Sequence, residues 1–546
     1  MSPEREEAKG EGRSSGADSP TTEATRGADF LKHYLADYYF DLKKYLIFAA
    51  QKLLFVPIVE ESVGSVVSFD LEDKWVCQSF LRQGKGLLSV CEFKCNIHSN
   101  KNSNFMQNIP FDRALVDEIV AKNKIKSVGA ASIREVKKII DDVEAATGEK
   151  FVRMEMGIPG LPAVQIGVDA EIEALKNGCA AIYPDIYGTK ELKHETARFV
   201  KNFLDVEVPE DCCVPTVGSM QGSFAAFMTL ARLDAKKNKI LFIDPGFPVQ
   251  KQQCVILGIE TIHFDVYDYR GDKLEAKLEQ YLSSGEVAAI VYSSPNNPAW
   301  FSFNEQELQI IAKVANRHDV VVVEDLAYFG MDFRKDYSKP GVPPFQPTVA
   351  KWAKKFLLMI SGSKAFSYAG QRIAVTILSP ELFDYKTDYM KKYFTQDCFG
   401  RALIFGSLYA LTSGTAFSPQ FALTAIFKAC NDGTYNFVEP LREYGNKAER
   451  MKKVLVENGF KIVYDKDMDV DVADGFYFTF SYPGYSGEEL LSELAYYGVS
   501  AISLRICRSE RLEGVRACVS LVPHQMIPVF EQRVKKFHED HPLATK

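Results

Sequence analysis

The chain has few histidines, no excess of basic residues and no long uninterrupted apolar run. Only 8 of its 546 residues are histidine, and no His-x-x-x-His pair stands out. The formal net charge of −7 gives no reason to expect nucleic acid or an anionic membrane as a partner. An apolar stretch at residues 45–58 is interrupted by Gln51, Lys52 and Pro57, whereas a membrane-spanning helix needs roughly 20 apolar residues. The sequence therefore predicts neither nucleic-acid binding nor a membrane span.

Cysteine is present, but its pattern does not suggest disulfides or a metal site. The 11 cysteines are scattered from Cys77 to Cys518, and an odd number in a long chain favours reduced intracellular thiols. Cys91 and Cys95 lie near His98, but a second cysteine pair, usual in structural zinc sites, is missing. No secretory signal is visible, and acidic residues near the N-terminus argue against a transit peptide. We therefore expect a cytoplasmic protein without a metal site.

The texture of the sequence changes along the chain, which is too long for one core. Residues 1–27 are polar and rich in Ser, Thr, Gly and Glu, which predicts a disordered tail. Residues 28–125 are harder to interpret, with a helical pattern at 29–55, a partly strand-like region at 62–95 and a polar loop at 97–108. We interpret residues 28–125 as an N-terminal extension of unknown role.

Regular patterns begin at about residue 131. Ser132 followed by Glu135 three residues later is a capping box, which predicts a helix that ends near Gly148. From 170 to 380, helical patterns alternate with short apolar runs at 240–244, 288–294, 320–326 and 356–361. Short apolar strands separated by helices are typical of a mostly parallel sheet covered on both faces. Residues 440–540 predict a smaller α+β domain.

The run at 356–361 leads directly into Ser361-Gly362-Ser363-Lys364, and Arg372 follows eight residues later. A lysine at the end of a buried strand loses hydration, which lowers its pKa and makes a nucleophilic amine available. A Schiff base requires such an amine, and the two serine hydroxyls with the arginine suit a phosphate. The pattern suggests pyridoxal phosphate (PLP), although alone it also fits an ordinary strand-end lysine.

Other strand ends carry polar residues as well, where parallel sheets bind ligands. Glu324 and Asp325 end one run. One of them could be a helix cap. Alternatively, a carboxylate beside the pyridine nitrogen of PLP would keep that nitrogen protonated and make the ring an electron sink. Asn296 and Asn297 end another run, either as turn residues or with an amide directed at a phenolic oxygen.

A small-residue turn before a helix, at Gly218 and Ser219, is placed to hold phosphate at the helix N-terminus. Phe247 offers either a flat face for a ring or a core side chain. Arg516 lies within an apolar strand pattern, where a charge needs a partner. A carboxylate bound through two hydrogen bonds is such a partner.

Three motifs, in this order, resemble the class I and II aminotransferases of fold type I, the aspartate aminotransferase superfamily. They are PNNP at 295–298, Asp325-x-Ala-Tyr328, and Ser361-x-Ser363-Lys364 with Arg372. The resemblance covers about residues 131–540 and implies an α/β fold, with a large domain on a mostly parallel seven-stranded sheet and a smaller α+β domain. The implied domains are 126–168 for the N-terminal part of the small domain and substrate loop, 169–430 for the large PLP-binding domain, and 431–546 for the C-terminal small domain.

The resemblance also implies residue roles. Lys364 forms the internal aldimine and moves the proton between Cα and cofactor. Asp325 pairs with the ring nitrogen, Asn297 and Tyr328 bond the phenolic oxygen, and Phe247 stacks on the ring. Gly157 and Arg516 bind substrate, the latter through the α-carboxylate. The implied phosphate ligands are Ser219, the backbone of Met220, Ser361, Ser363, Arg372 and Tyr183, the last reaching the phosphate of the neighbouring subunit in a homodimer with shared active sites.

Some positions depart from the family pattern. Ala299 and Trp300 stand where the family usually has Thr-Gly, and we expect the indole to crowd or reshape this turn. Ala374 replaces the usual glycine after the phosphate arginine, and GSMQGS is a variant of the phosphate loop. None of these changes removes a catalytic group.

The implied function is a PLP-dependent aminotransferase that moves an amino group between a 2-amino acid and a 2-oxo acid by a ping-pong mechanism. A PLP-dependent lyase or decarboxylase would carry the same cofactor residues, and a non-catalytic regulatory or binding protein could reuse the fold. The substrate side chain stays open. Arg401 or Lys392 could bind a second carboxylate, and the aromatic stretch from Tyr385 to Phe405 could line an aromatic pocket or pack a dimer.

Overall fold

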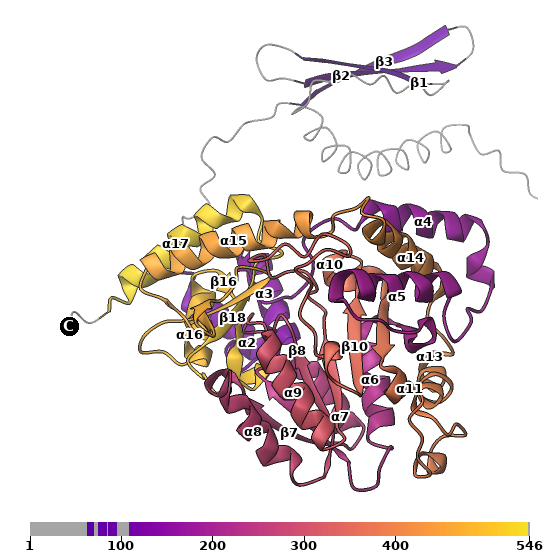
Figure 1. The fold of residues 1–546 in the computed structure, drawn as a ribbon. Helices are drawn as coiled ribbons and strands as arrows, with labels where there is room; N and C mark the ends of the chain where they lie inside the picture. The colour runs from indigo at the N-terminus through magenta and orange to yellow at the C-terminus, as the bar shows by residue number, and fades with distance from the viewer. Residues whose placement is uncertain (1–62, 70–74, 84–85, 96–108, 544–546) are drawn as a thin grey trace, which may run out of the picture. The chain divides into compact units, whose positions relative to one another are not determined.

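The computed structural model describes residues 63–69, 75–83, 86–95 and 109–543, which divide into two compact units, Met1–Ser103 and Asn104–Lys546 (Figure 1). In the first unit, strands β1 (Val63–Phe69), β2 (Trp75–Gln83) and β3 (Gly86–Cys95) form an antiparallel sheet, consistent with the strand-like pattern at 62–95. The predictions for the tail at 1–27, the helix at 29–55, the apolar stretch at 45–58 and the loop at 97–108 lie outside the described residues, as does His98.

The second unit is built on a seven-stranded sheet with the strand order β5-β11-β10-β9-β8-β6-β7. Strands β10, β9, β8, β6 and β7 pair in parallel, whereas β11 pairs antiparallel with both β10 and β5. The predicted mostly parallel sheet is therefore confirmed. In this order the strands span Cys213–Thr216, Ala374–Leu378, Phe356–Ser361, Val321–Asp325, Val287–Ser293, Lys239–Asp244 and Glu260–Asp265.

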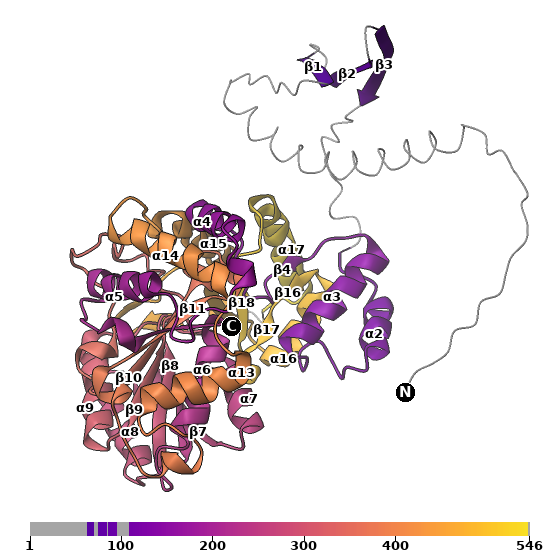
Figure 2. The same cartoon turned by 90° about the vertical axis from the view of Figure 1, so that its right-hand side faces the viewer.

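Helices cover both faces of this sheet because its strands are apolar on both sides (Figures 1 and 2). Alternate side chains of β6 enter different cores, Leu241 and Ile243 one and Ile240 and Phe242 the other. The first core also contains residues of α5 (Lys190–Leu204), α8 (Lys273–Leu282), α9 (Glu305–Arg317) and α14 (Phe417–Asn431). The second contains residues of α6 (Gly218–Leu230), α7 (Pro248–Ile256) and the π-helical η7 (Ala402–Leu408).

Segments from both ends of the second unit form a smaller α+β region. The sheet β12-β15-β18-β17 comprises Lys461–Ile462, Tyr477–Ser481, Val515–Cys518 and Ile502–Ser503, and β4 (Val152–Arg153) pairs in parallel with β16 (Val499–Ser500). Its helices are α2 (Arg113–Lys122), α3 (Ile133–Thr147), α15 (Val438–Glu457), α16 (Gly487–Tyr496) and α17 (Ile527–Asp540). The remaining elements are α4 (Gln165–Lys176), α10 (Gly362–Ala365), α11 (Pro380–Phe383), α12 (Phe399–Arg401), α13 (Tyr409–Thr412), β13 (Lys466–Asp467) and β14 (Val470–Asp471).

Helix α3 begins and ends where the sequence predicts. Ser132 and Glu135 form the reciprocal capping box, and Gly148 ends the helix in the left-handed conformation. Helix α2 lies before it, and the Phe111 N–H donates to the Tyr496 carbonyl of α16 at 2.7 Å. The domain boundaries within this unit stay predictions. No helix in the described ranges is both long and apolar enough to cross a membrane.

Candidate active site

Lys364 lies in the short helix α10, directly after the central strand β10. Ser361 caps this helix and accepts a hydrogen bond from the Ser363 N–H at 3.0 Å. The Lys364 amine donates to the carbonyl of Gly157, so the structure brings together the predicted catalytic lysine and a residue of the predicted substrate loop. Loss of hydration, aided by the nearby positive charge of Arg516, lowers the pKa of Lys364 to about 8.

The two acids at the end of β9 lie in different environments. Glu324 is used by the fold: its carboxylate accepts hydrogen bonds from the Tyr292 hydroxyl at 3.1 Å, the Thr348 hydroxyl at 2.5 Å and the Val349 N–H at 3.2 Å. Asp325 accepts from the Gln250 amide at 3.0 Å and from a backbone N–H at 3.1 Å. Burial raises the pKa of Asp325 to about 6, which the hydrogen bonds from Gln250 and the Ala327 N–H offset only in part.

Arg516 of β18 is held in a fixed orientation inside the protein, where it is 2% exposed. Its Nη1 donates to the Asn297 side-chain oxygen at 3.2 Å, and its Nη2 donates to the Glu155 carbonyl at 2.7 Å. The guanidinium lies 4.5 Å from the centre of the Tyr477 ring. Its buried Nε has no hydrogen-bond partner among the described residues, which leaves N–H groups able to bind a carboxylate.

An aromatic group borders this arginine. The hydroxyls of Tyr328 and Tyr477 are 2.8 Å apart, and the Trp300 indole packs edge-on against both rings with centroid distances of 5.4 and 5.9 Å. Trp300 adopts a positive φ of 67° and is 1% exposed. The expected reshaping of the turn thus takes the form of an indole packed inward, where the backbone at Gly475 leaves it room.

The predicted phosphate ligands also lie together. Arg372 donates to the Ser363 hydroxyl at 3.3 Å, and its guanidinium packs so closely on Gly218 that a Cβ there would lie 2.4 Å from it. Gly218 has a φ of 67° and begins α6, whose first backbone N–H groups have no partner within the helix. The next residue, Ser219, carries a buried hydroxyl without a hydrogen-bond partner in the described part of the chain. Met220 follows Ser219 in the first turn of α6. This arrangement suits an anion.

Other predicted residues do not join this cluster. Phe247 lies at the N-cap of α7 and is half-buried. Tyr183 is 88% exposed. Arg401 is exposed on α12, with its Nε 3.2 Å from the Cys398 sulfur.

Asn296 takes the turn role that the sequence left open. Its side-chain N–H donates to the Pro245 carbonyl at 2.9 Å, and its side-chain oxygen accepts from the Ala299 N–H at 3.0 Å.

Three other residues of the site have no local sequence signal. Tyr477, Gln250 and Glu155, which contact Tyr328, Asp325 and Arg516 respectively, are not predicted. Each comes from a segment remote in sequence from the residue it contacts, so only the fold reveals it.

The chain is similar to known aminotransferases. Residues 152–409 match the family model described as aminotransferase class I and II. Nicotianamine aminotransferase 1 of Oryza sativa is 25% identical over 179 residues, which are 33% of this chain and 34% of that protein. The chain spans between about a third and three fifths of the length of the first curated relatives it matches.

Solved structures show the same fold. A Thermus thermophilus aspartate aminotransferase mutant superposes with a TM-score of 0.60 at 18% identity, covering 74% of this chain and 97% of that chain. An alanine aminotransferase from Pyrococcus furiosus gives 0.60 at 17% identity, covering 75% and 97%. Residues 152–409 thus resemble the aminotransferase class I and II family, and the chain shares the fold of solved aminotransferases.

Proposed function

We propose that this protein is a PLP-dependent aminotransferase that transfers an amino group between a 2-amino acid and a 2-oxo acid by a ping-pong mechanism. The observation that supports this proposal best is the environment of the Lys364 amine. This amine has a pKa lowered to about 8 and lies in one site with a buried carboxylate, Asp325, and an arginine with N–H groups to spare, Arg516. The family uses PLP, so the fit of these residues to that cofactor is the next question.

The residues present fit PLP at both of its charged ends. The unpartnered Ser219 hydroxyl, the Gly218 turn and Arg372 suit its phosphate, with Ser361, Ser363 and the Met220 N–H beside them. Asp325 has no cationic partner in the described chain, and a protonated pyridine nitrogen would supply one. Asn297 and Tyr328 would bond the phenolic oxygen, and Phe247 would stack on the ring. Bound PLP supplies an electron sink for a carbanion at the substrate Cα.

The chain's own residues then bind, orient and move a proton. Arg516 binds the substrate α-carboxylate through its unpaired N–H groups, which fixes the Cα relative to Lys364. The neutral Lys364 amine accepts the Cα proton and returns it at the product stage. Trp300, Tyr328 and Tyr477 are all buried, and they exclude water from this side of the site.

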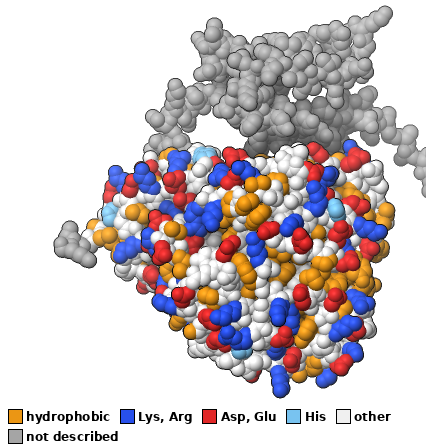
Figure 3. Space-filling view, viewed as in Figure 1, with side chains coloured by type: hydrophobic (Ala, Val, Ile, Leu, Met, Phe, Trp, Pro, Cys, Tyr) orange, Lys and Arg blue, Asp and Glu red, His pale blue; other side chains and the backbone are white. Residues whose placement is uncertain are grey.

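A homodimer completes this proposal. Tyr183 is 88% exposed, and the neighbouring Ile182 is 59% exposed, while α4 presents Ile172 and Leu175 at 46% and 47%. Figure 3 shows apolar side chains among the charged ones on the face that bears α4. Covering such apolar surface by a second copy favours association. It would allow Tyr183 to reach the phosphate of the neighbouring site.

The absorbance spectrum of the purified protein tests the proposal. We expect a yellow band from lysine-bound PLP that bleaches when amino acids are added and returns when a 2-oxo acid is added. A band that amino acids never change would contradict amino transfer. Release of ammonia or CO2 in place of a 2-oxo acid would show a lyase or a decarboxylase. Absence of a band even after PLP is added would contradict cofactor binding.

The pH dependence of Lys364 reactivity provides a test that does not need turnover. Because burial lowers the pKa of Lys364 to about 8, the cofactor-free protein should expose a neutral amine at this position from about pH 8 upward. We expect labelling of Lys364 by a small aldehyde and borohydride to rise with a midpoint near pH 8. Peptide mass spectrometry would measure it, with the 65% exposed Lys150 as the internal reference. A Lys364 midpoint as high as that of Lys150 would contradict this prediction.

A further inference from the structure

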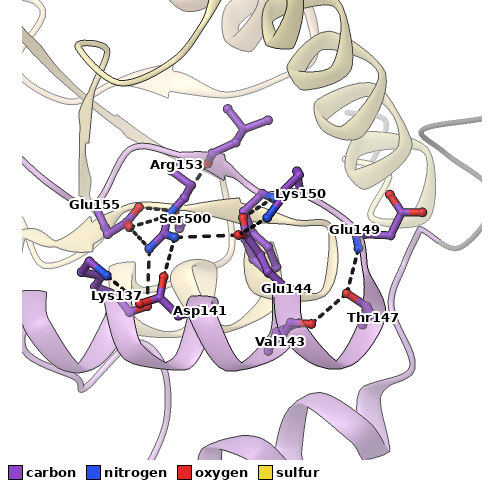
Figure 4. A network of polar contacts seen from close by, with 12 residues as sticks. Lys137, Asp141, Val143, Glu144, Thr147, Glu149, Lys150, Arg153, Glu155 and Ser500 are labelled. Carbon is purple, nitrogen blue, oxygen red and sulfur yellow. Dashed lines mark hydrogen bonds and ion pairs between the residues drawn. The ribbon is translucent and has the colours of Figure 1, made fainter. Parts of the chain in front are cut away.

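Glu155 is a buried acid whose backbone contacts Arg516 and whose side chain has no predicted role. Its side chain is 1% exposed and accepts three hydrogen bonds from two residues (Figure 4). Arg153 donates to its Oε1 through Nε at 2.9 Å and Nη2 at 2.8 Å, and the Ser500 hydroxyl donates to its Oε2 at 2.5 Å. These contacts supply the counter-charge and hydrogen bonds that a buried carboxylate requires.

The carboxylate is also anchored to a helix through Arg153. The Nη1 of Arg153 binds Asp141 of α3 at 2.6 Å, and its Nη2 reaches the Lys137 carbonyl at 3.4 Å. Lys137 in turn pairs with Asp141 at 2.6 Å (Figure 4). The arginine is 25% exposed, so it bridges a surface ion pair and a buried acid. Its planar fork makes this bridge more rigid than a lysine would.

The same residue holds the substrate arginine through its backbone. The Glu155 carbonyl accepts a hydrogen bond from the Arg516 Nη2 at 2.7 Å. The other hydrogen bond of this guanidinium goes to the Asn297 side-chain oxygen. Backbone pairing between β4 and β16 extends to the Met154 N–H, which donates to the Ser500 carbonyl at 3.2 Å. Glu155 follows this pairing directly. The Met154 carbonyl just before it accepts from the Cys518 N–H of β18 at 2.9 Å, and the side-chain bonds of Glu155 add a second anchor for the peptide group that carries its carbonyl.

We infer that Glu155, with Arg153 and Ser500, is a positioning unit for substrate binding. It orients the Arg516 guanidinium so that the free N–H groups face the substrate carboxylate. The unit does not touch the reacting atoms, and it acts through Arg516. This inference rests on the proposed function, because it assigns the carboxylate of the substrate as the ligand of Arg516.

Two substitutions test the unit. Glu155→Gln keeps the shape of the side chain and removes the charge that holds Arg153, and Ser500→Ala removes the other donor. We expect the KM for the amino acid to rise about 10-fold in each, as for other residues that orient a ligand-binding group. The kcat should change by less than about 2-fold, because the lost interaction acts equally on bound substrate and transition state. Arg153→Lys should restore part of the affinity lost in Arg153→Met.

The control is Lys150→Met, which removes an ion pair to Glu144 at 3.1 Å in the same network without touching Glu155 (Figure 4). It should leave KM unchanged. The dissociation constant of propanoate, a carboxylate without an amino group, is measured on the same PLP-loaded proteins by thermal shift. This dissociation constant should rise in the same variants in which the KM rises.

Unchanged KM and propanoate affinity in folded Glu155→Gln would overturn the inference, and so would a loss confined to kcat. If Glu155→Gln does not fold, Ser500→Ala decides by the same criteria. Wild-type protein that binds propanoate but transfers no amino group would contradict the proposed function alone. The ratio of the propanoate dissociation constants of Glu155→Gln and wild type would still decide the role of Glu155. Wild-type protein that binds no propanoate would overturn both.

Discussion

Replacing Lys364 by alanine should reduce amino transfer by at least about 10⁴-fold while the protein stays folded. The substitution removes the amine that we propose as acceptor of the Cα proton, which is also the proposed nucleophile. Stability should be nearly unaffected, because the amine is held in a site that disfavours its charge. Single-turnover kinetics and a thermal unfolding curve measure the two effects.

A second buried lysine provides the matched control for this experiment. Lys447 on α15 is 7% exposed and pairs with Glu443 at 3.3 Å. Lys447→Ala should lower the unfolding temperature and keep kcat. A small amine added to Lys364→Ala should restore part of the proton transfer, because the deleted side chain leaves space for it. Transfer by Lys364→Ala at the wild-type rate would contradict the assigned role.

The strands that carry the site follow closely from the sequence. The apolar runs predicted at 240–244, 288–294, 320–326 and 356–361 lie within one residue of strands β6, β8, β9 and β10 at each end. Strands that are buried on both faces are almost continuously apolar, so few other segments of the sequence could form them. Polar residues at their carboxyl ends must then meet at one edge of the sheet. That is why the strand ends at Lys364, at Glu324–Asp325 and at Asn296–Asn297 could be located without coordinates, whereas the family resemblance implied the choice of Asp325 and Asn297.

The supporting residues could not be found in this way. Ser500 lies 345 positions from Glu155, and Tyr477 lies 149 positions from Tyr328. Neither pair has a motif: the first contact depends on the pairing of β4 with β16, and the second on how the smaller sheet meets the large one. Local chemistry also failed to distinguish neighbours such as Asn296 and Asn297, since both fit a turn. Only their partners, the Pro245 carbonyl for one and Arg516 for the other, separate the two roles.

The adjacent acids Glu324 and Asp325 yield the second large prediction. Asp325→Asn should lower kcat by about 10³-fold, because an amide cannot hold the proton on a pyridine nitrogen as a carboxylate does. Glu324→Gln should keep kcat within about 2-fold and cost about 1–3 kcal/mol of unfolding free energy, because its amide group would face three donors. The two substituted residues are neighbours on β9. A difference in kcat between the two variants therefore separates a role at the cofactor from the effect of changing a buried acid.

The stability of the cofactor-free protein should depend on pH through the buried Asp325 carboxyl. The pKa of Asp325 is raised from 3.8 to about 6 by burial, so the unfolded chain loses this proton at a lower pH than the folded protein. Asp325 therefore lowers stability as the pH rises from about 4 to 6, and that loss persists above pH 6. Cofactor-free Asp325→Asn should accordingly unfold at a higher temperature than wild type at pH 8. A destabilised Asp325→Asn with unchanged kcat would show that Asp325, like Glu324, serves the fold and not the cofactor.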